Sequence, residues 1–102
     1  MKAKSAKKSG RYVVVRGDKS GVFAGTLVSR KGREVVLTRC RRIWYWAGAA
    51  SISELAQRGT SNPGACKFPA PVDRQEVLDV IEVIDCTVAA RVSIEGVKPW
   101  TA

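Results

Sequence analysis

The stretch RYVVVRGDKSGVFAGTLVSRKGREVVLTRC, residues 11–40, decides the fold. It contains three runs rich in β-branched and aromatic residues, which favour β-strands, at residues 11–18, 22–30 and from 34 onward. The runs are separated by DKSG (18–21) and RKGR (30–33), whose Asp and Gly residues are typical of turns. We therefore predict three antiparallel strands joined by short turns.

The third strand is predicted over residues 34–46, as one strand or with a break near residues 38–42. Gly25 lies inside the second strand. Glycine there indicates a β-bulge or a close approach of another backbone.

A short helix is predicted over residues 52–58, because SISE (51–54) has the pattern of a capping box. The Ser51 hydroxyl is expected to accept from the backbone N–H of Glu54, and the Glu54 side chain to accept from the N–H of Ser51. Gly59 is expected to end the helix.

The remaining chain supplies extended segments and a second helix. CKFPAPV (66–72) is an edge strand or an irregular crossing, since its two prolines lack an N–H donor. EVLDVIEVID (76–85) is predicted to be one strand. Thr87 is expected to cap a helix over about 88–95, ended by Gly96. Trp100 is expected to fold back onto the core or a neighbouring subunit.

The predicted element order is β-β-β-α-β-β-α, an α+β fold with a mostly antiparallel sheet and two short helices. A chain of 102 residues that is 45% hydrophobic is enough for one domain, which we assign to residues 11–102. Residues 1–10 contain four lysines and no apolar periodicity, and we predict a disordered basic tail. No apolar run is long enough for an export signal or a membrane span.

The net charge of +9 is unevenly distributed. Residues 30–42 carry six basic side chains against one acid, and residues 73–85 carry five acids against one arginine. A basic face suits a phosphate-rich partner, and the two opposite charge runs suit self-association. The alternative is a solvated surface with internal salt bridges. Arg11, Arg16 and Lys19 either extend the basic face or pair with the acids of residues 76–85.

Catalysis and metal binding find little support in the residue types. The chain has three cysteines and no histidine, and the cysteine spacing fits no zinc pattern. We interpret the cysteines as reduced, small apolar residues, with a reactive thiol as the alternative. We expect no enzyme activity, no cofactor and no metal.

The segment RRIWYW, residues 41–46, is the strongest candidate for a binding site. In an extended strand Arg42, Trp44 and Trp46 share one face, while Ile43 and Tyr45 share the other. Two indoles beside a cation can stack a nucleobase and hold a phosphate. The alternative is that the tryptophans belong to the core.

Phosphate contacts are expected from Arg39, Arg41 and Arg42, because guanidinium groups bind phosphate through two hydrogen bonds. The small residues AGAAS follow at 47–51, and a helix N-terminus comes next with free N–H groups near Ser51 and Ser53. These seven residues form the predicted ligand site: Arg39, Arg41, Arg42, Trp44, Trp46, Ser51 and Ser53.

The chain resembles a family of small proteins of unknown function encoded mainly by bacteriophages and prophages. The resemblance is carried by RYVVVRGDKSGVFAGTLVS, RRIWYWAGAASISELAQRGTS, CKFPAPV and EVIDCTVAARVSIEGVKPWTA, with WYWAGAAS (44–51) the most distinctive part. Because this family has no known activity, the resemblance assigns no functional residue to this chain. It implies a phage product that acts in the cytoplasm of an infected bacterium.

Three functions are compatible with these features. The first is a homo-oligomeric, non-enzymatic binder that sequesters a small phosphorylated nucleotide, cyclic or linear, such as a bacterial immune signal. The second is a sequence-tolerant nucleic-acid-binding protein whose lysine tail contacts the phosphate backbone. The third is a structural or host-protein-binding module.

Overall fold

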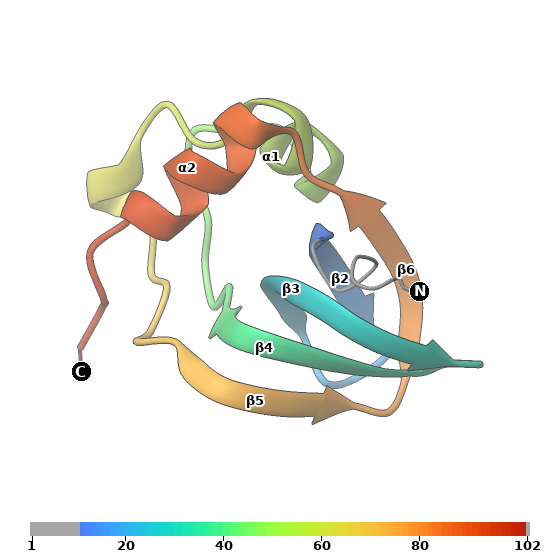
Figure 1. Cartoon of the computed structure of the whole chain (residues 1–102). Helices are drawn as coiled ribbons and strands as arrows, with labels where there is room; N and C mark the ends of the chain where they lie inside the picture. Colours follow the sequence, from blue (N-terminus) through green and yellow to red (C-terminus); the bar gives the residue numbers. More distant parts are fainter. Residues whose placement is uncertain (1–10, 102) are drawn as a thin grey trace.

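A five-stranded antiparallel sheet and two helices make up the fold, as the computed structural model of residues 11–101 shows (Figure 1). The α+β class and the element order predicted from the sequence are confirmed, with one added 3₁₀ turn, η2. The predicted tail, residues 1–10, lies outside the described residues. The elements are β2 (Tyr12–Gly17), β3 (Val22–Lys31), β4 (Glu34–Arg42), α1 (Ile52–Arg58), η2 (Pro63–Ala65), β5 (Val72–Val77), β6 (Val80–Asp85) and α2 (Val88–Gly96).

The sheet is curled into an open barrel. Its strand order is β5-β4-β3-β2-β6, so β5 and β6 lie at opposite edges although only Leu78 and Asp79 separate them in the chain. A link this short can join opposite edges only if the sheet bends round and brings them together, and Figure 1 shows this curvature. The prediction of one strand over residues 76–85 was therefore wrong, because Leu78 and Asp79 form the turn between two strands.

Asp79 fastens this turn to the turn between β2 and β3. Its carboxylate accepts hydrogen bonds from the backbone N–H groups of Lys19 (2.8 Å) and Ser20 (3.0 Å) and from the Ser20 hydroxyl (2.5 Å). These donors lower the pKa of Asp79, because each favours the ionised carboxylate; the hydrogen bond from the Ser20 hydroxyl has the largest effect. At the next position the Val80 N–H donates to the Arg33 carbonyl at 2.9 Å, which ties the β3–β4 hairpin to β6.

The hydrophobic residues form two clusters that meet at β2. One fills the barrel and includes Val13, Val15 and Phe23; the other lies between the sheet and the helices and includes Tyr12 and Val14. Successive side chains of a strand point to opposite faces, so the YVVV run of β2 is buried on both sides. This strand is the centre of the structure.

A β-bulge interrupts β4 where it passes Gly25 of β3. Thr26 pairs with Thr38 and Ala24 with Arg41, so Arg39 and Cys40 together face Gly25. Arg39 takes a positive φ of 51°, which is uncommon for a residue other than glycine. The predicted bulge at Gly25 is confirmed. The predicted strand over residues 34–46 is too long, because β4 runs without a break through residues 38–42 and ends at Arg42.

Both helices cover the same end of the barrel, as Figure 1 shows. Helix α1 begins and ends at the predicted residues, with Ser51 accepting from the Glu54 N–H at 3.2 Å and Gly59 following at φ 76°. Thr87 caps α2 as predicted, by accepting from the N–H of Ala90. The Glu54 carboxylate, however, accepts from the N–H of Ala50 and not from that of Ser51.

The bulge gives a test with a matched control. A Cβ atom at Gly25 would lie 3.0 Å from the Thr38 carbonyl oxygen and 3.1 Å from Cys40 Cα, whereas a Cβ atom at Gly96 would meet nothing within 4 Å. We expect Gly25→Ala to lower the free energy of unfolding by about 1–3 kcal/mol through crowding. Gly96→Ala, at the end of α2, should leave it unchanged or raise it by up to about 1 kcal/mol. Urea denaturation measures both, and equal effects would contradict the assigned role of Gly25.

Candidate functional site

Arg41 is buried, with only 3% of its surface exposed. Its guanidinium donates to the carbonyls of Ile94 (3.0 Å) and Val97 (2.6 Å) at the end of α2. It also donates to the carbonyls of Phe68 (2.8 Å) and Pro69 (3.2 Å) in the crossing that precedes β5. Its bonds therefore join two segments distant in sequence.

The structure disfavours the prediction that Arg41 binds phosphate, because its donors serve these backbone carbonyls and only 3% of its surface is exposed. The physical reason is the bulge at residues 39–40. Cys40 takes the inward position after Val35 and Leu37, and Arg41 is thereby turned toward the helices. Burial lowers the pKa of Arg41, and the negative ends of the α2 carbonyl dipoles compensate the charge.

Arg42 is exposed but held away from the tryptophans. Its guanidinium lies over the Phe23 ring, 4.5 Å from the centroid, and donates to the Ser20 carbonyl at 2.9 Å. Arg39 is exposed at the bulge and lines a hollow of about 250 Å³ with Tyr12, Arg41 and other residues. Arg39 and Arg41 therefore border one hollow, whereas Arg42 is held at Phe23 and Ser20 outside it.

The predicted donors at the start of α1 already have an acidic neighbour. The Glu54 carboxylate lies 2.6 Å from the Ala50 nitrogen and supplies a negative charge at the helix start. The Ser51 hydroxyl is used as the helix cap, and Ser53 is exposed. A phosphate near Ser51 and Ser53 would be repelled by this carboxylate, so the arrangement disfavours anion binding there.

The two tryptophans of the predicted platform differ in environment. Trp44 is 66% exposed, whereas Trp46 packs against the cluster between sheet and helices. Both interpretations of the tryptophans therefore hold in part: Trp46 belongs to the edge of the core, and Trp44 presents its ring to solvent.

An exposed aromatic cluster begins at the residue after Trp44, whose backbone N–H donates to the Lys67 carbonyl at 3.1 Å. It consists of Tyr45 and Trp100, 52% and 36% exposed, with the Lys67 amine between them at 5.9 Å and 5.5 Å from the two ring centroids. We call Trp44, Tyr45, Lys67 and Trp100 the aromatic surface.

The backbone fixes the aromatic surface. Tyr45 and Lys67 form an isolated antiparallel bridge, in which the Lys67 N–H donates to the Tyr45 carbonyl at 2.8 Å. The Trp100 N–H donates to the Phe68 carbonyl at 2.9 Å. Sequence reasoning missed Tyr45, Lys67 and Trp100 as site residues, because these contacts join segments far apart in the chain. The predicted return of Trp100 onto the core was the one available signal.

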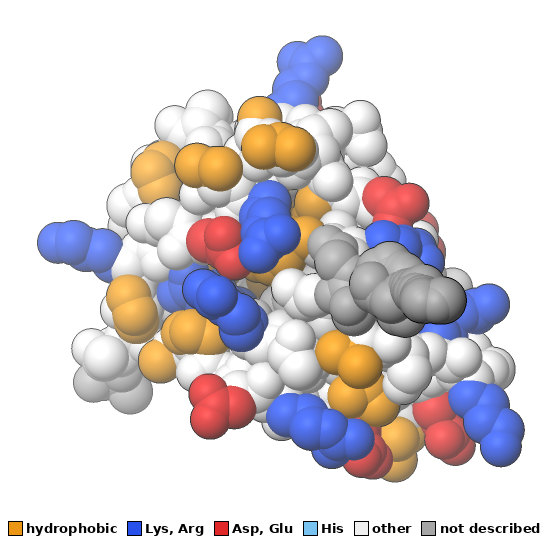
Figure 2. Space-filling view, viewed as in Figure 1, with side chains coloured by type: hydrophobic (Ala, Val, Ile, Leu, Met, Phe, Trp, Pro, Cys, Tyr) orange, Lys and Arg blue, Asp and Glu red, His pale blue; other side chains and the backbone are white. Residues whose placement is uncertain are grey.

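Much of the acidic run at residues 73–85 is neutralised within the chain. Asp85 pairs with Arg11 at 2.9 Å, Glu82 with Arg16 at 3.6 Å and Glu76 with Arg74 at 2.9 Å. Internal salt bridges thus account for these acids, and they weaken the argument for charge-driven self-association. Figure 2 shows basic side chains spread over the visible face with acids between them.

The described residues show no cluster of metal ligands, and the Cys40 and Cys86 thiols are not activated. Within residues 11–101 no three His, Cys, Asp or Glu side chains gather in a way that could hold a metal ion. Burial raises the pKa of the Cys40 and Cys86 thiols to about 11, so both stay protonated at neutral pH. No helix in this part of the chain is long and apolar enough to cross a membrane.

Comparison with known proteins gives one family match. Residues 10–94 match the model of a family described as a domain of unknown function, DUF6948. No curated protein and no solved structure matches the chain.

Substitution of Arg41 separates a structural role from a ligand-binding role. Arg41→Met would remove one donor from each of four backbone carbonyls, so we expect the free energy of unfolding to fall by about 3–5 kcal/mol. Arg42→Met, at an exposed site, should cost less than about 1 kcal/mol. Urea denaturation monitored by tryptophan fluorescence measures both. A stable Arg41→Met protein would contradict the structural role.

Proposed function

Because the chain belongs to the family described as domain of unknown function DUF6948, whose description names no activity, we propose a function from the geometry: sequence-tolerant binding of single-stranded nucleic acid. The observation that carries the proposal is the aromatic surface, in which exposed rings surround a lysine amine. The proposed binding is non-enzymatic.

Rings and amine have complementary roles in this proposal. Exposed aromatic rings stack on nucleobases, and each stacked base contributes about 1–3 kcal/mol with little dependence on its identity. The Lys67 amine attracts the phosphate that follows a stacked base. Stacking and phosphate contacts do not read base edges, so binding should tolerate many sequences.

A compact nucleotide suits this surface less well than a polymer. Sites for small ligands are concave and enclose most of the ligand, whereas the aromatic surface is open. Arg41 is buried, and the Glu54 carboxylate at the start of α1 would repel a phosphate, so two parts of the predicted nucleotide site are poorly suited to an anion. Sequestration of a signalling nucleotide in a homo-oligomer stays a second hypothesis, and the experiment below includes it.

The proposed setting follows from the resemblance to bacteriophage and prophage proteins. A product acting in the cytoplasm of an infected bacterium meets single-stranded DNA and RNA there. The net charge of +9 favours such partners, because it attracts polyanions at long range.

Trp44→Ala tests the stacking contribution. We expect the affinity for a fluorescein-labelled dT oligonucleotide, measured by fluorescence anisotropy, to fall by about 5- to 150-fold, the equivalent of one stacked base. Leu78→Ala is the matched control, since Leu78 is a large exposed apolar residue outside the aromatic surface. A panel of cyclic and linear mononucleotides is tested alongside by thermal shift. Tight binding of one mononucleotide that is lost in Trp44→Ala would favour the sequestration hypothesis instead.

Salt titration tests the polymer directly. The logarithm of the affinity should fall linearly with the logarithm of salt concentration, with a slope of about −0.7 for each phosphate neutralised on a single strand. Deletion of residues 1–10 removes four lysines and should reduce the magnitude of the slope by up to about 3 if all four contact phosphate. A slope near zero in the intact chain would exclude backbone binding.

A further inference from the structure

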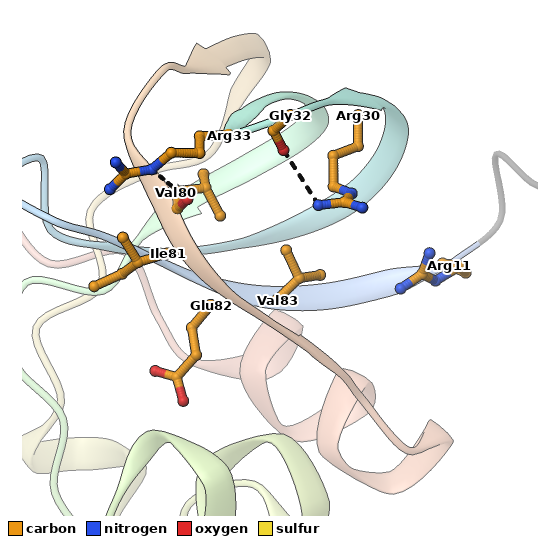
Figure 3. Close-up of a pocket in the computed structure, with 8 residues that line it drawn as sticks. All are labelled: Arg11, Arg30, Gly32, Arg33, Val80, Ile81, Glu82 and Val83. Carbon is orange, nitrogen blue, oxygen red and sulfur yellow. Dashed lines mark hydrogen bonds between the residues drawn. The ribbon is translucent and has the colours of Figure 1, made fainter.

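A hollow lies between the tip of the β3–β4 hairpin and β6. It has a volume of about 640 Å³. Arg30 and Arg33 come from the hairpin, Arg11 from the segment leading into β2, and the floor from β6 (Figure 3). We call it the arginine groove. Its full lining is Arg11, Arg30, Gly32, Arg33, Val80, Ile81, Glu82 and Val83.

Each of the two hairpin arginines makes one hydrogen bond to a backbone carbonyl. Arg30 donates one N–H to the Gly32 carbonyl at 3.2 Å, and Arg33 donates its Nε–H to the Val80 carbonyl at 3.4 Å. Neither makes an ion pair with an acid of residues 11–101. Each guanidinium has five N–H donors, so most of them are left for a ligand.

Two acids near the groove, Glu82 and Asp85, are already paired. Glu82 pairs with Arg16, and Figure 3 shows its carboxylate directed away from the three guanidinium groups. Arg11 is bonded to Asp85 at 2.9 Å and so contributes less net charge than the other two arginines. The groove therefore presents Arg30 and Arg33 as free cations above the apolar floor of Val80 and Val83.

We propose that the arginine groove binds the phosphates of a phosphate polymer. Guanidinium groups bind phosphate oxygens through paired hydrogen bonds, and Figure 3 shows Arg30 and Arg33 apart from one another along the groove, which suits phosphates spaced along an extended chain. No aromatic side chain lines the groove, so it has no stacking partner for a base. A polymer recognised there is recognised by its backbone.

The groove is distinct from the aromatic surface. Arg33 directly precedes β4, while Trp44 follows the end of β4 by two residues. A nine-residue strand spans about 30 Å at 3.3 Å per residue, so the two places lie at opposite ends of it. The identification of the polymer as nucleic acid rests on the proposed function, whereas phosphate binding in the groove does not.

Inorganic polyphosphate, which has no bases, is the probe that separates the two. We expect the double variant Arg30→Gln/Arg33→Gln to lose about tenfold or more in affinity for polyphosphate, measured by competition with labelled oligonucleotide and by calorimetry. The control Arg58→Gln/Lys98→Gln removes the same charge from exposed positions outside the groove and should lose less than about threefold. Arg30→Lys/Arg33→Lys keeps the charge but not the paired bonds and should fall between them.

Equal losses in the Arg30/Arg33 and Arg58/Lys98 variants would overturn the groove, because net charge alone would then explain binding. Absence of polyphosphate binding by the unaltered chain would also overturn it. If Trp44→Ala leaves oligonucleotide affinity unchanged while Arg30→Gln/Arg33→Gln lowers polyphosphate affinity, the proposed base stacking is rejected and phosphate binding in the arginine groove is supported. Thermal unfolding of every variant is measured in parallel, and the charge-retaining lysine variant decides the matter if the glutamine variant is less stable.

Discussion

The hydrogen bonds of the buried Arg41 guanidinium are the interaction on which the packing of α2 and of the crossing before β5 depends. A charge in the interior is costly unless hydrogen bonds satisfy it, and here four backbone carbonyls do so. Two of these carbonyls end α2 and two belong to the crossing before β5, so a single side chain fastens the C-terminal helix to the sheet. The Phe68 carbonyl accepts from both Arg41 and the Trp100 N–H. Arg41 and Trp100 of the aromatic surface therefore share one backbone acceptor, although Arg41 itself is almost fully buried.

The curvature of the sheet depends on the length of the connection between β5 and β6. Two residues connect strands at opposite edges of the sheet, and this connection is short enough only in a curled sheet. The bonds of Asp79 to the β2–β3 turn and of Val80 to Arg33 hold the curl closed. The same curl carries the β3–β4 hairpin over β6, and the arginine groove is the space that remains between them. The short β5–β6 connection therefore both curls the sheet and creates the arginine groove.

Local patterns predicted the helices closely, because the signals for their ends lie within a few residues of one another. Ser51 and Gly59 define α1, and Thr87 begins α2. The candidate site was harder to predict, since the bulge at Arg39 reverses which face each later residue of β4 occupies. Strict alternation would have kept Arg41 in step with Val35 and Leu37, and its burial against α2 depends on one extra residue opposite Gly25. Contacts such as Tyr45 with Lys67 arise from the path of the crossing, which no local pattern encodes.

The separation of rings and free guanidiniums bears on the kind of ligand. A mononucleotide needs its base and phosphate bound within a few ångströms of each other, and the predicted site assumed such closeness. In the structure the exposed rings lie near one end of β4 and the free arginines near the other, about 30 Å apart on the strand's length. Only an extended ligand can use both. The proposed stacking at one end and the proposed phosphate contacts at the other are therefore compatible with a polymer and not with a compact nucleotide that uses both, and this distance is a more specific argument than the net charge of the chain.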